Sequence, residues 1–148
     1  MMCKIAVVYW SGTGNTETMA RAVTEGAQAD GAKVTLLTAK EFTPVIVDCY
    51  DAIAFGCPAM GAEVLEEDEF EPMFTACQPK LRDKRIALFG SYGWGDGEWM
   101  RNWEETCQEI GAVLACDSVI CEEAPDEETI DACRALGKAL SDPNAVRD

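Results

Sequence analysis

Histidine is absent from the 148 residues of this chain. Its absence excludes Ser-His-Asp and Cys-His catalysis and removes the commonest protein ligand of transition metals. Eight cysteines are present, but none form a C-x-x-C pair, which argues against zinc, iron–sulfur and thioredoxin-like sites. We expect these cysteines to be reduced and mostly buried.

Long apolar runs are missing as well. No stretch approaches the roughly 20 residues that a membrane-spanning helix needs, and the first residues run into an apolar segment without the layout of a signal peptide. With nearly half of its residues apolar, the chain can still bury a core. We therefore expect one soluble, cytoplasmic domain over residues 1–148, with no membrane partner.

Basic residues are few, with 12 Lys and Arg against 27 Asp and Glu and a net charge of −15. This charge disfavours nucleic acids and anionic membrane surfaces as partners. It suits electrostatic attraction of a basic partner protein, and it equally suits a generally acidic surface that aids solubility. Composition alone leaves both interpretations open.

Apolar runs alternate with helical patterns five times along the chain. The predicted strands are residues 4–9, 33–37, 52–56, 85–90 and 113–120. The predicted helices are residues 15–29, 66–77, 98–110 and 127–139, with a shorter one near 44–48. Continuously apolar strands indicate a buried, mostly parallel sheet. A lone domain of this size favours an open, doubly wound sheet over a barrel fragment, with its ligand at the carboxyl ends of the strands.

The loop after the first predicted strand is rich in glycine and polar side chains. Its sequence is Ser11-Gly12-Thr13-Gly14-Asn15-Thr16. A turn from a strand into a helix aims free N–H groups and the positive end of the helix dipole at one point, which suits an anion. No Lys or Arg lies between Lys4 and Arg21, so neutral donors would hold that anion. The alternative is an ordinary glycine-rich connection with a helix cap.

Other phosphate-binding loops do not match this sequence. A P-loop needs Gly-Lys-Ser/Thr, but Asn15 and Thr16 follow Gly14. The dinucleotide fingerprint needs a third glycine where Glu17 stands. A receiver domain would place acidic residues where Tyr9 precedes Trp10. The composition of the loop therefore favours a terminal monophosphate.

Two further loops, after the third and fourth predicted strands, have unusual sequences. Residues 56–63 present Met60 beside Gly61, and residues 90–99 alternate glycine with aromatic rings, including Tyr92 and Trp94. Met60 on one loop and the aromatic rings on the other can form two apolar walls of a binding site, and the glycines keep the backbone of both loops flexible. Together with the first loop, they indicate a slot for a planar, phosphorylated ring system.

These three motifs resemble those of the short-chain flavodoxins, closest to the clostridial type. The resemblance extends from Lys4 to about Ala139 and rests on residues 11–16, 58–63 and 91–97. It implies the flavodoxin-like fold, an open doubly wound five-stranded parallel sheet in the order 2-1-3-4-5 with helices on both faces. It also implies non-covalent FMN and low-potential, one-electron transfer between redox enzymes. The chain would then be a monomeric electron carrier, and its redox partners would have basic docking faces.

The resemblance assigns roles to individual positions. Residues 11–16 and Ser91 would bind the FMN phosphate, with Trp10 and Trp99 shielding it. Trp94 and Met60 would stack on opposite faces of the isoalloxazine, and Glu63 would accept a hydrogen bond from its N3–H. The remaining residues expected to line the cofactor are Pro58, Ala59, Ala62, Tyr92, Gly93 and Gly95.

Gly61 would be the redox-linked switch, because its peptide could flip and let its carbonyl accept N5–H of the neutral semiquinone. Ala62 departs from the larger polar residue often found there in clostridial relatives, which affects the energetics of that flip. Two alternatives stay open on the sequence. One is an FMN-dependent NAD(P)H:quinone reductase of the same fold, and the other is a protein-interaction module that stores FMN or lacks it.

Overall fold

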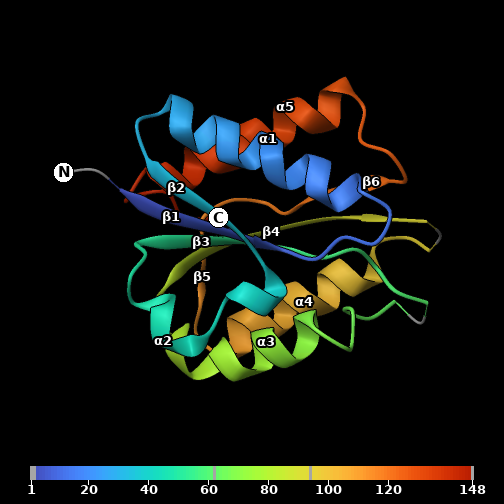
Figure 1. The fold of residues 1–148 in the computed structure, drawn as a ribbon, viewed down its shortest axis with the longest axis horizontal. Helices are drawn as coiled ribbons and strands as arrows, with labels where there is room; N and C mark the ends of the chain where they lie inside the picture. The colour runs from blue at the N-terminus through green and yellow to red at the C-terminus, as the bar shows by residue number, and fades with distance from the viewer. Residues whose placement is uncertain (1–2, 62, 94, 148) are drawn as a thin grey trace.

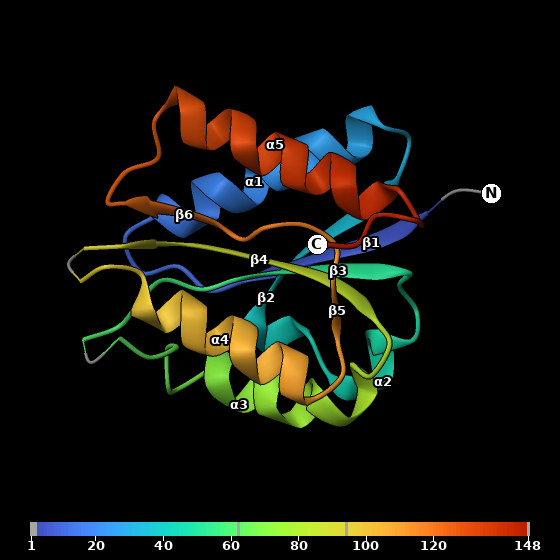
Figure 2. The ribbon, with the colours of Figure 1, turned by 180° about the vertical axis from the view of Figure 1, so that it is seen from behind.

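The computed structural model describes residues 3–61, 63–93 and 95–147 as three layers, with a sheet between two layers of helices (Figure 1). Helices α1 and α5 cover one face, and α2, α3 and α4 cover the other, as the view from behind also shows (Figure 2). The strands are β1 Lys4–Tyr9, β2 Lys33–Thr38, β3 Ala52–Gly56, β4 Arg85–Tyr92, β5 Val113–Leu114 and β6 Val119–Glu122. The helices are α1 Asn15–Ala29, α2 Pro44–Val47, α3 Phe70–Cys77, α4 Glu98–Glu109 and α5 Glu127–Ser141, with 3₁₀ turns η1 Ala39–Glu41 and η2 Gln78–Lys80.

The sheet is parallel and has the order β2-β1-β3-β4-β5, with β6 also paired to β4. This confirms the predicted strand order and the helices on both faces. The pairing sets Tyr9 of β1 opposite Gly56 of β3, and Gly56 opposite Phe89 of β4. The carboxyl ends of these three central strands therefore lie at one edge of the sheet, where the three predicted loops meet.

Two apolar layers explain why the central strands are continuously apolar. Along β1, Ile5 and Val7 pack with α1 and α5, whereas Ala6 and Val8 belong to the cluster on the opposite face. All four side chains are fully buried. A strand buried on both faces has no polar position, as expected for parallel sheets covered by helices.

The fifth strand was predicted as one segment, residues 113–120, and this prediction is wrong. Leu114 pairs with Ile86 of β4, and Val119 pairs with Phe89. The chain advances five residues between these pairs, whereas β4 advances three. Two extra residues therefore leave the ladder, and the strand divides into β5 and β6. The detour is held by Glu104, whose Oε2 accepts hydrogen bonds from the Ser118 hydroxyl at 2.6 Å and from the Arg147 guanidinium at 2.7 Å.

Helix α3 begins four residues later than the predicted residue 66. The carboxylate of Glu66 accepts hydrogen bonds from the N–H groups of Asp68, Glu69 and Phe70 at 2.7 to 2.8 Å. This side chain replaces the backbone acceptors that a helix would supply, so the chain turns before α3 starts. The other predicted helices lie within two residues of their observed ends.

All eight cysteines are free thiols. Four of them are buried, three are half-buried and Cys49 is exposed, so the expectation that most are buried holds for only half. Burial raises the pKa of the Cys57 thiol to about 12, which keeps it protonated. Within the described residues, no cluster of three metal-ligating side chains occurs. Nor does any described helix have the length and apolarity to span a membrane.

Candidate functional site

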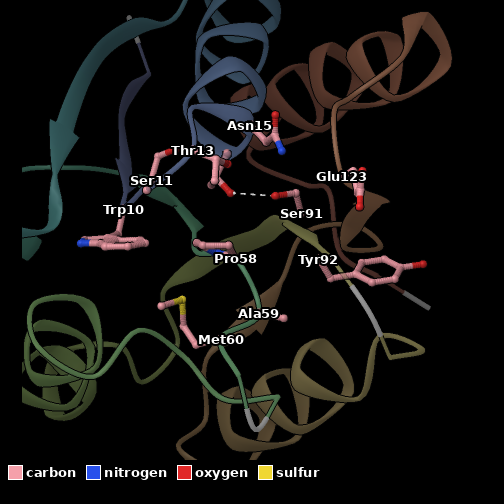
Figure 3. A pocket seen from close by; sticks show the side chains of 13 residues that line it. Trp10, Ser11, Thr13, Asn15, Pro58, Ala59, Met60, Ser91, Tyr92 and Glu123 are labelled. Atoms are coloured by element: carbon pink, nitrogen blue, oxygen red, sulfur yellow. Dashed lines mark hydrogen bonds between the residues drawn. The ribbon is translucent and has the colours of Figure 1, made fainter.

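A cavity of about 410 Å³ lies at the carboxyl ends of β1, β3 and β4. The close view shows side chains from all three loops around it (Figure 3). Of the described residues, thirteen line it, and all except Glu123 are predicted cofactor-binding residues: Trp10, Ser11, Gly12, Thr13, Asn15, Thr16, Pro58, Ala59, Met60, Ser91, Tyr92, Gly93 and Glu123. Its volume lies within the range of small-molecule sites, roughly 300–1,000 Å³.

The Ser11–Thr16 loop is shaped by its own hydroxyl and by one glycine. The Oγ of Ser11 accepts hydrogen bonds from the N–H groups of Gly14, at 3.0 Å, and Glu17, at 3.3 Å. Gly14 precedes α1 with a φ of 98°, a left-handed conformation that suits glycine. Ser11 thus occupies the Glu17 amide, and Gly14 has no capping side chain, so the Asn15 and Thr16 amides at the start of α1 remain available to a ligand.

The chemistry of this loop fits a phosphate. No Lys or Arg is among the lining residues, so the donors are backbone amides and hydroxyl groups at the positive end of the α1 dipole. Thr16 and Ser91 are almost fully buried, and their hydroxyl oxygens lie 3.4 Å apart (Figure 3). Strand β4 extends two residues beyond the predicted residue 90, so Ser91 lies within it, and this contact joins the Ser11–Thr16 loop to the carboxyl end of β4.

Met60 lies on the opposite side of the cavity in a tight turn. The Met60 N–H donates to the Val64 carbonyl at 2.9 Å, and the Glu63 N–H donates to the Met60 carbonyl at 2.7 Å. Glu63 has a φ of 54°, which costs free energy for a residue with a side chain. Gly61 is exposed at the tip, and a Cβ there would meet no atom of the described residues within 4 Å. Packing in this conformation therefore does not explain a glycine at position 61.

Glu63 and Gly95, also predicted to bind the cofactor, are not among the residues that line the main cavity. Glu63 borders a neighbouring hollow of about 260 Å³ between α3 and α4, and its buried Oε1 has no hydrogen-bond partner among the described residues. A Cβ on Gly95, whose φ is 91°, would overlap this carboxylate. Ala62 and Trp94 were predicted to line the cofactor and lie outside the described residues.

Trp10 and Trp99 have different surroundings. Trp10 lines the cavity, whereas Trp99 is 2% exposed and lies in the core, where its Nε1–H donates to the Cys57 carbonyl at 3.1 Å. The Trp99 ring also packs against Tyr92, with centroids 5.5 Å apart. Trp99 does not face the cavity. It packs behind Tyr92, which lines the cavity.

Sequence reasoning missed Glu123. It follows β6 with a φ of 59°, and its N–H donates to the Tyr92 carbonyl at 2.7 Å. The side chain is the only charged one among the lining residues of this cavity. The signal was available, because the loop after the last parallel strand also reaches the edge where ligands bind.

The fold and the site define a class: a doubly wound α/β domain with an anion-binding loop and a slot at its topological switch point. The family model for flavodoxins matches residues 7–137. The chain belongs to the flavodoxin family.

Individual relatives agree with this assignment. The flavodoxin of Megasphaera elsdenii is 43% identical over 137 residues, which cover 93% of this chain and 98% of the relative. The flavodoxin of Clostridium beijerinckii is 43% identical over 135 residues, covering 91% and 97%. The solution structure of two-electron reduced Megasphaera elsdenii flavodoxin gives a TM-score of 0.86, covering 93% of this chain and 98% of that chain.

The predicted family, the FMN cofactor and the electron-carrier function are confirmed by these relationships. Nothing in them favours the quinone reductase alternative. A structure described as a flavodoxin from the domain Archaea, 25% identical with a TM-score of 0.82, has the same fold.

Proposed function

We propose that residues 1–148 form a single domain that holds FMN non-covalently in the main cavity and passes single electrons between redox proteins. The observation that carries this proposal is the junction of three loops around one cavity, with neutral donors at one end and Met60 and Tyr92 further along it. When bound, FMN supplies two one-electron steps. The protein supplies binding, orientation and the electrostatic environment.

At the phosphate end, we infer that the amides and hydroxyls of residues 11–16 and the Ser91 hydroxyl donate to the FMN phosphate. The Thr16–Ser91 contact places two donors at one point. Neutral donors leave the phosphate charge in place inside a chain of net charge −15, and this negative potential disfavours adding a further electron to the cofactor. The chain thereby favours a low reduction potential for its second step.

At the ring end, we propose that Met60 and Trp94 pack on opposite faces of the flavin and that Glu63 accepts a hydrogen bond from its N3–H. Glu63 does not line the main cavity, so its role rests on the resemblance to flavodoxins; its Oε1 is an acceptor without a partner among the described residues. Pro58, Ala59 and Tyr92 extend the apolar wall.

Gly61 is the proposed switch. Its carbonyl would accept a hydrogen bond from flavin N5 after one electron and one proton are gained. The open space around Gly61 supports this role, because the observed conformation does not itself require glycine. A second peptide orientation, accessible to glycine and strained for other residues, accounts for its presence.

We propose that the partners are redox proteins that exchange electrons with this chain. Their basic faces would dock against its acidic surface. Small, charge-guided and short-lived contacts suit electron transfer. A monomer in the cytoplasm is the proposed state.

Titration of the apo-protein with FMN and with riboflavin tests where the cofactor binds. The proposal predicts that FMN binds at least about a hundredfold more tightly, because only FMN offers a phosphate to the Ser11–Thr16 loop. Replacing the donor pair, Thr16→Val with Ser91→Ala, should reduce FMN affinity and leave riboflavin affinity nearly unchanged. Equal losses for the two flavins would mean that the phosphate lies elsewhere.

A further inference from the structure

Trp10 connects the end of β1 to the phosphate loop. Its N–H donates to the Gly56 carbonyl at 3.0 Å, which continues the pairing of β1 with β3. Its ring lies against Gly12, where a Cβ would be 3.1 Å from the nearest ring carbon. The ring therefore limits where the backbone of the Ser11–Thr16 loop can lie. A change in the ring's orientation would alter both the loop and the wall of the cavity.

The Trp10 ring is held by a residue far along the chain. Its Nε1–H donates to Oε1 of Glu69, 59 residues later, at 3.1 Å in a partly buried setting. The ring nitrogen lies on the side of Trp10 that is turned away from the other labelled residues (Figure 3). The ring thus presents carbon edge and face to the cavity and its polar atom to Glu69.

Glu69 is itself fixed by its neighbours. Its N–H donates to the Glu66 carboxylate at 2.8 Å, and its carbonyl accepts the Met73 N–H at 3.3 Å. Its second carboxylate oxygen is 3.4 Å from Nζ of Lys40, whose side chain is 75% exposed. That exposed ion pair contributes little. The partly buried bond to Trp10 is the contact that gives the carboxylate a structural role.

We propose that Glu69 is a positioning residue for the cofactor site, which orients the Trp10 ring and through it the phosphate-binding loop. This inference rests on the proposed binding of the FMN phosphate by that loop. A charge-assisted hydrogen bond is directional and stronger than one between neutral groups, so it selects one ring orientation in the absence of ligand. The loop is thereby ordered before the cofactor arrives, which reduces the entropy lost on binding.

A double-mutant cycle on FMN affinity tests this role. Glu69→Leu should weaken FMN binding about tenfold, since it removes a charged hydrogen-bond acceptor. Glu69→Gln, whose amide oxygen can still accept the indole proton, should retain most of the affinity. Both effects should vanish in a Trp10→Phe background. Glu71→Leu, which removes an exposed charge from the first turn of α3, is the matched control and should change little.

A second readout uses the apo-protein and does not depend on FMN. The indole N–H resonance of Trp10, assigned by its loss in Trp10→Phe, should shift and exchange faster with water in Glu69→Leu and not in Glu71→Leu. An unchanged resonance, or an equal affinity loss in both backgrounds, would overturn the role of Glu69. Failure of the unaltered chain to bind FMN would instead contradict the proposed function, and the indole resonance would still decide whether Glu69 holds the ring.

Discussion

At the scale of single residues, Glu123 carries a conformational cost. Its φ of 59° lies in the left-handed region, which glycine and asparagine adopt far more readily than glutamate does. The side chain is exposed at the rim of the main cavity. The backbone hydrogen bond to Tyr92 holds the turn and does not depend on which side chain is present.

Glu123→Asn should therefore stabilise the apo-protein, raising its free energy of unfolding by up to about 1 kcal/mol, because left-handed strain is reduced. Urea unfolding without FMN measures this effect apart from cofactor binding. Glu122→Asn, in the extended strand β6, is the control and should not be stabilising. A loss of stability in Glu123→Asn would mean that the carboxylate makes a favourable interaction larger than the strain.

Gly61 is the residue on which the proposed switch depends. Gly61→Ala should lower the yield of the one-electron-reduced protein, and Gly61→Val should lower it more. Each added carbon restricts the second peptide orientation further. The fold should tolerate both changes, because the space around a Cβ at this position is open. Absorbance during anaerobic titration measures the yield, and FMN affinity in the oxidised state is the internal control. Equal yields across the series would rule out the switch.

At the scale of elements, the start of α3 depends on one buried carboxylate. Glu66 is 4% exposed and accepts three backbone hydrogen bonds. Burial alone would raise the pKa of this carboxyl, but the bonds from Phe70, Glu69 and Asp68 outweigh burial and hold the pKa below its ordinary value. The ionised form is thus the one that stabilises the fold.

The sign of the pH dependence follows from that shift. Because the folded pKa lies below the unfolded one, the contribution of Glu66 is complete above the ordinary glutamate value and is lost as pH falls through the lowered pKa. Glu66→Gln should cost about 1–3 kcal/mol near neutral pH. The cost should shrink in acid, where the carboxyl of the unaltered chain is also protonated.

Urea unfolding of Glu66→Gln at several pH values measures this, with the exposed neighbour change Glu67→Gln as control. A cost that stays constant from neutral pH into acid would contradict the capping role of the carboxylate.

Helices and strands could be predicted from the sequence where a local pattern of apolar residues determines them. Continuous apolar runs located β1 and β3, since burial on both faces leaves a recognisable composition. The division of the last strand depends on the distant residue Glu104, and the late start of α3 depends on a side chain that competes with helix formation. Neither contact leaves a periodic signal, so sequence reasoning could not find them.

The site could be predicted in large part because the carboxyl ends of parallel strands meet at one edge. Once the order of β1, β3 and β4 was inferred, their loops had to converge. What could not be inferred was which side chains of a loop face the cavity. Trp99, in the first turn of α4, points into the core. The topology placed the loop after β6 at this edge, but nothing in its composition indicated that Glu123 would line the cavity.

At the scale of the whole molecule, the net charge of −15 governs encounters with partners. Reduction by a basic redox protein should slow about tenfold between roughly 10 mM and 150 mM salt, as the screening length falls from about 30 Å to about 8 Å. Stopped-flow measurement of flavin reduction gives this rate. A neutral small-molecule reductant is the control and should show little salt dependence. A salt-independent rate with the basic partner would indicate apolar docking instead.

Anaerobic stepwise reduction of the FMN-loaded protein, followed by visible absorbance, tests the central claim most directly. A one-electron carrier should accumulate a blue, one-electron-reduced form before it bleaches, and NAD(P)H alone should not reduce it. Bleaching in a single two-electron step, above all with NAD(P)H alone, would contradict the account and would make this flavodoxin-family chain a reductase.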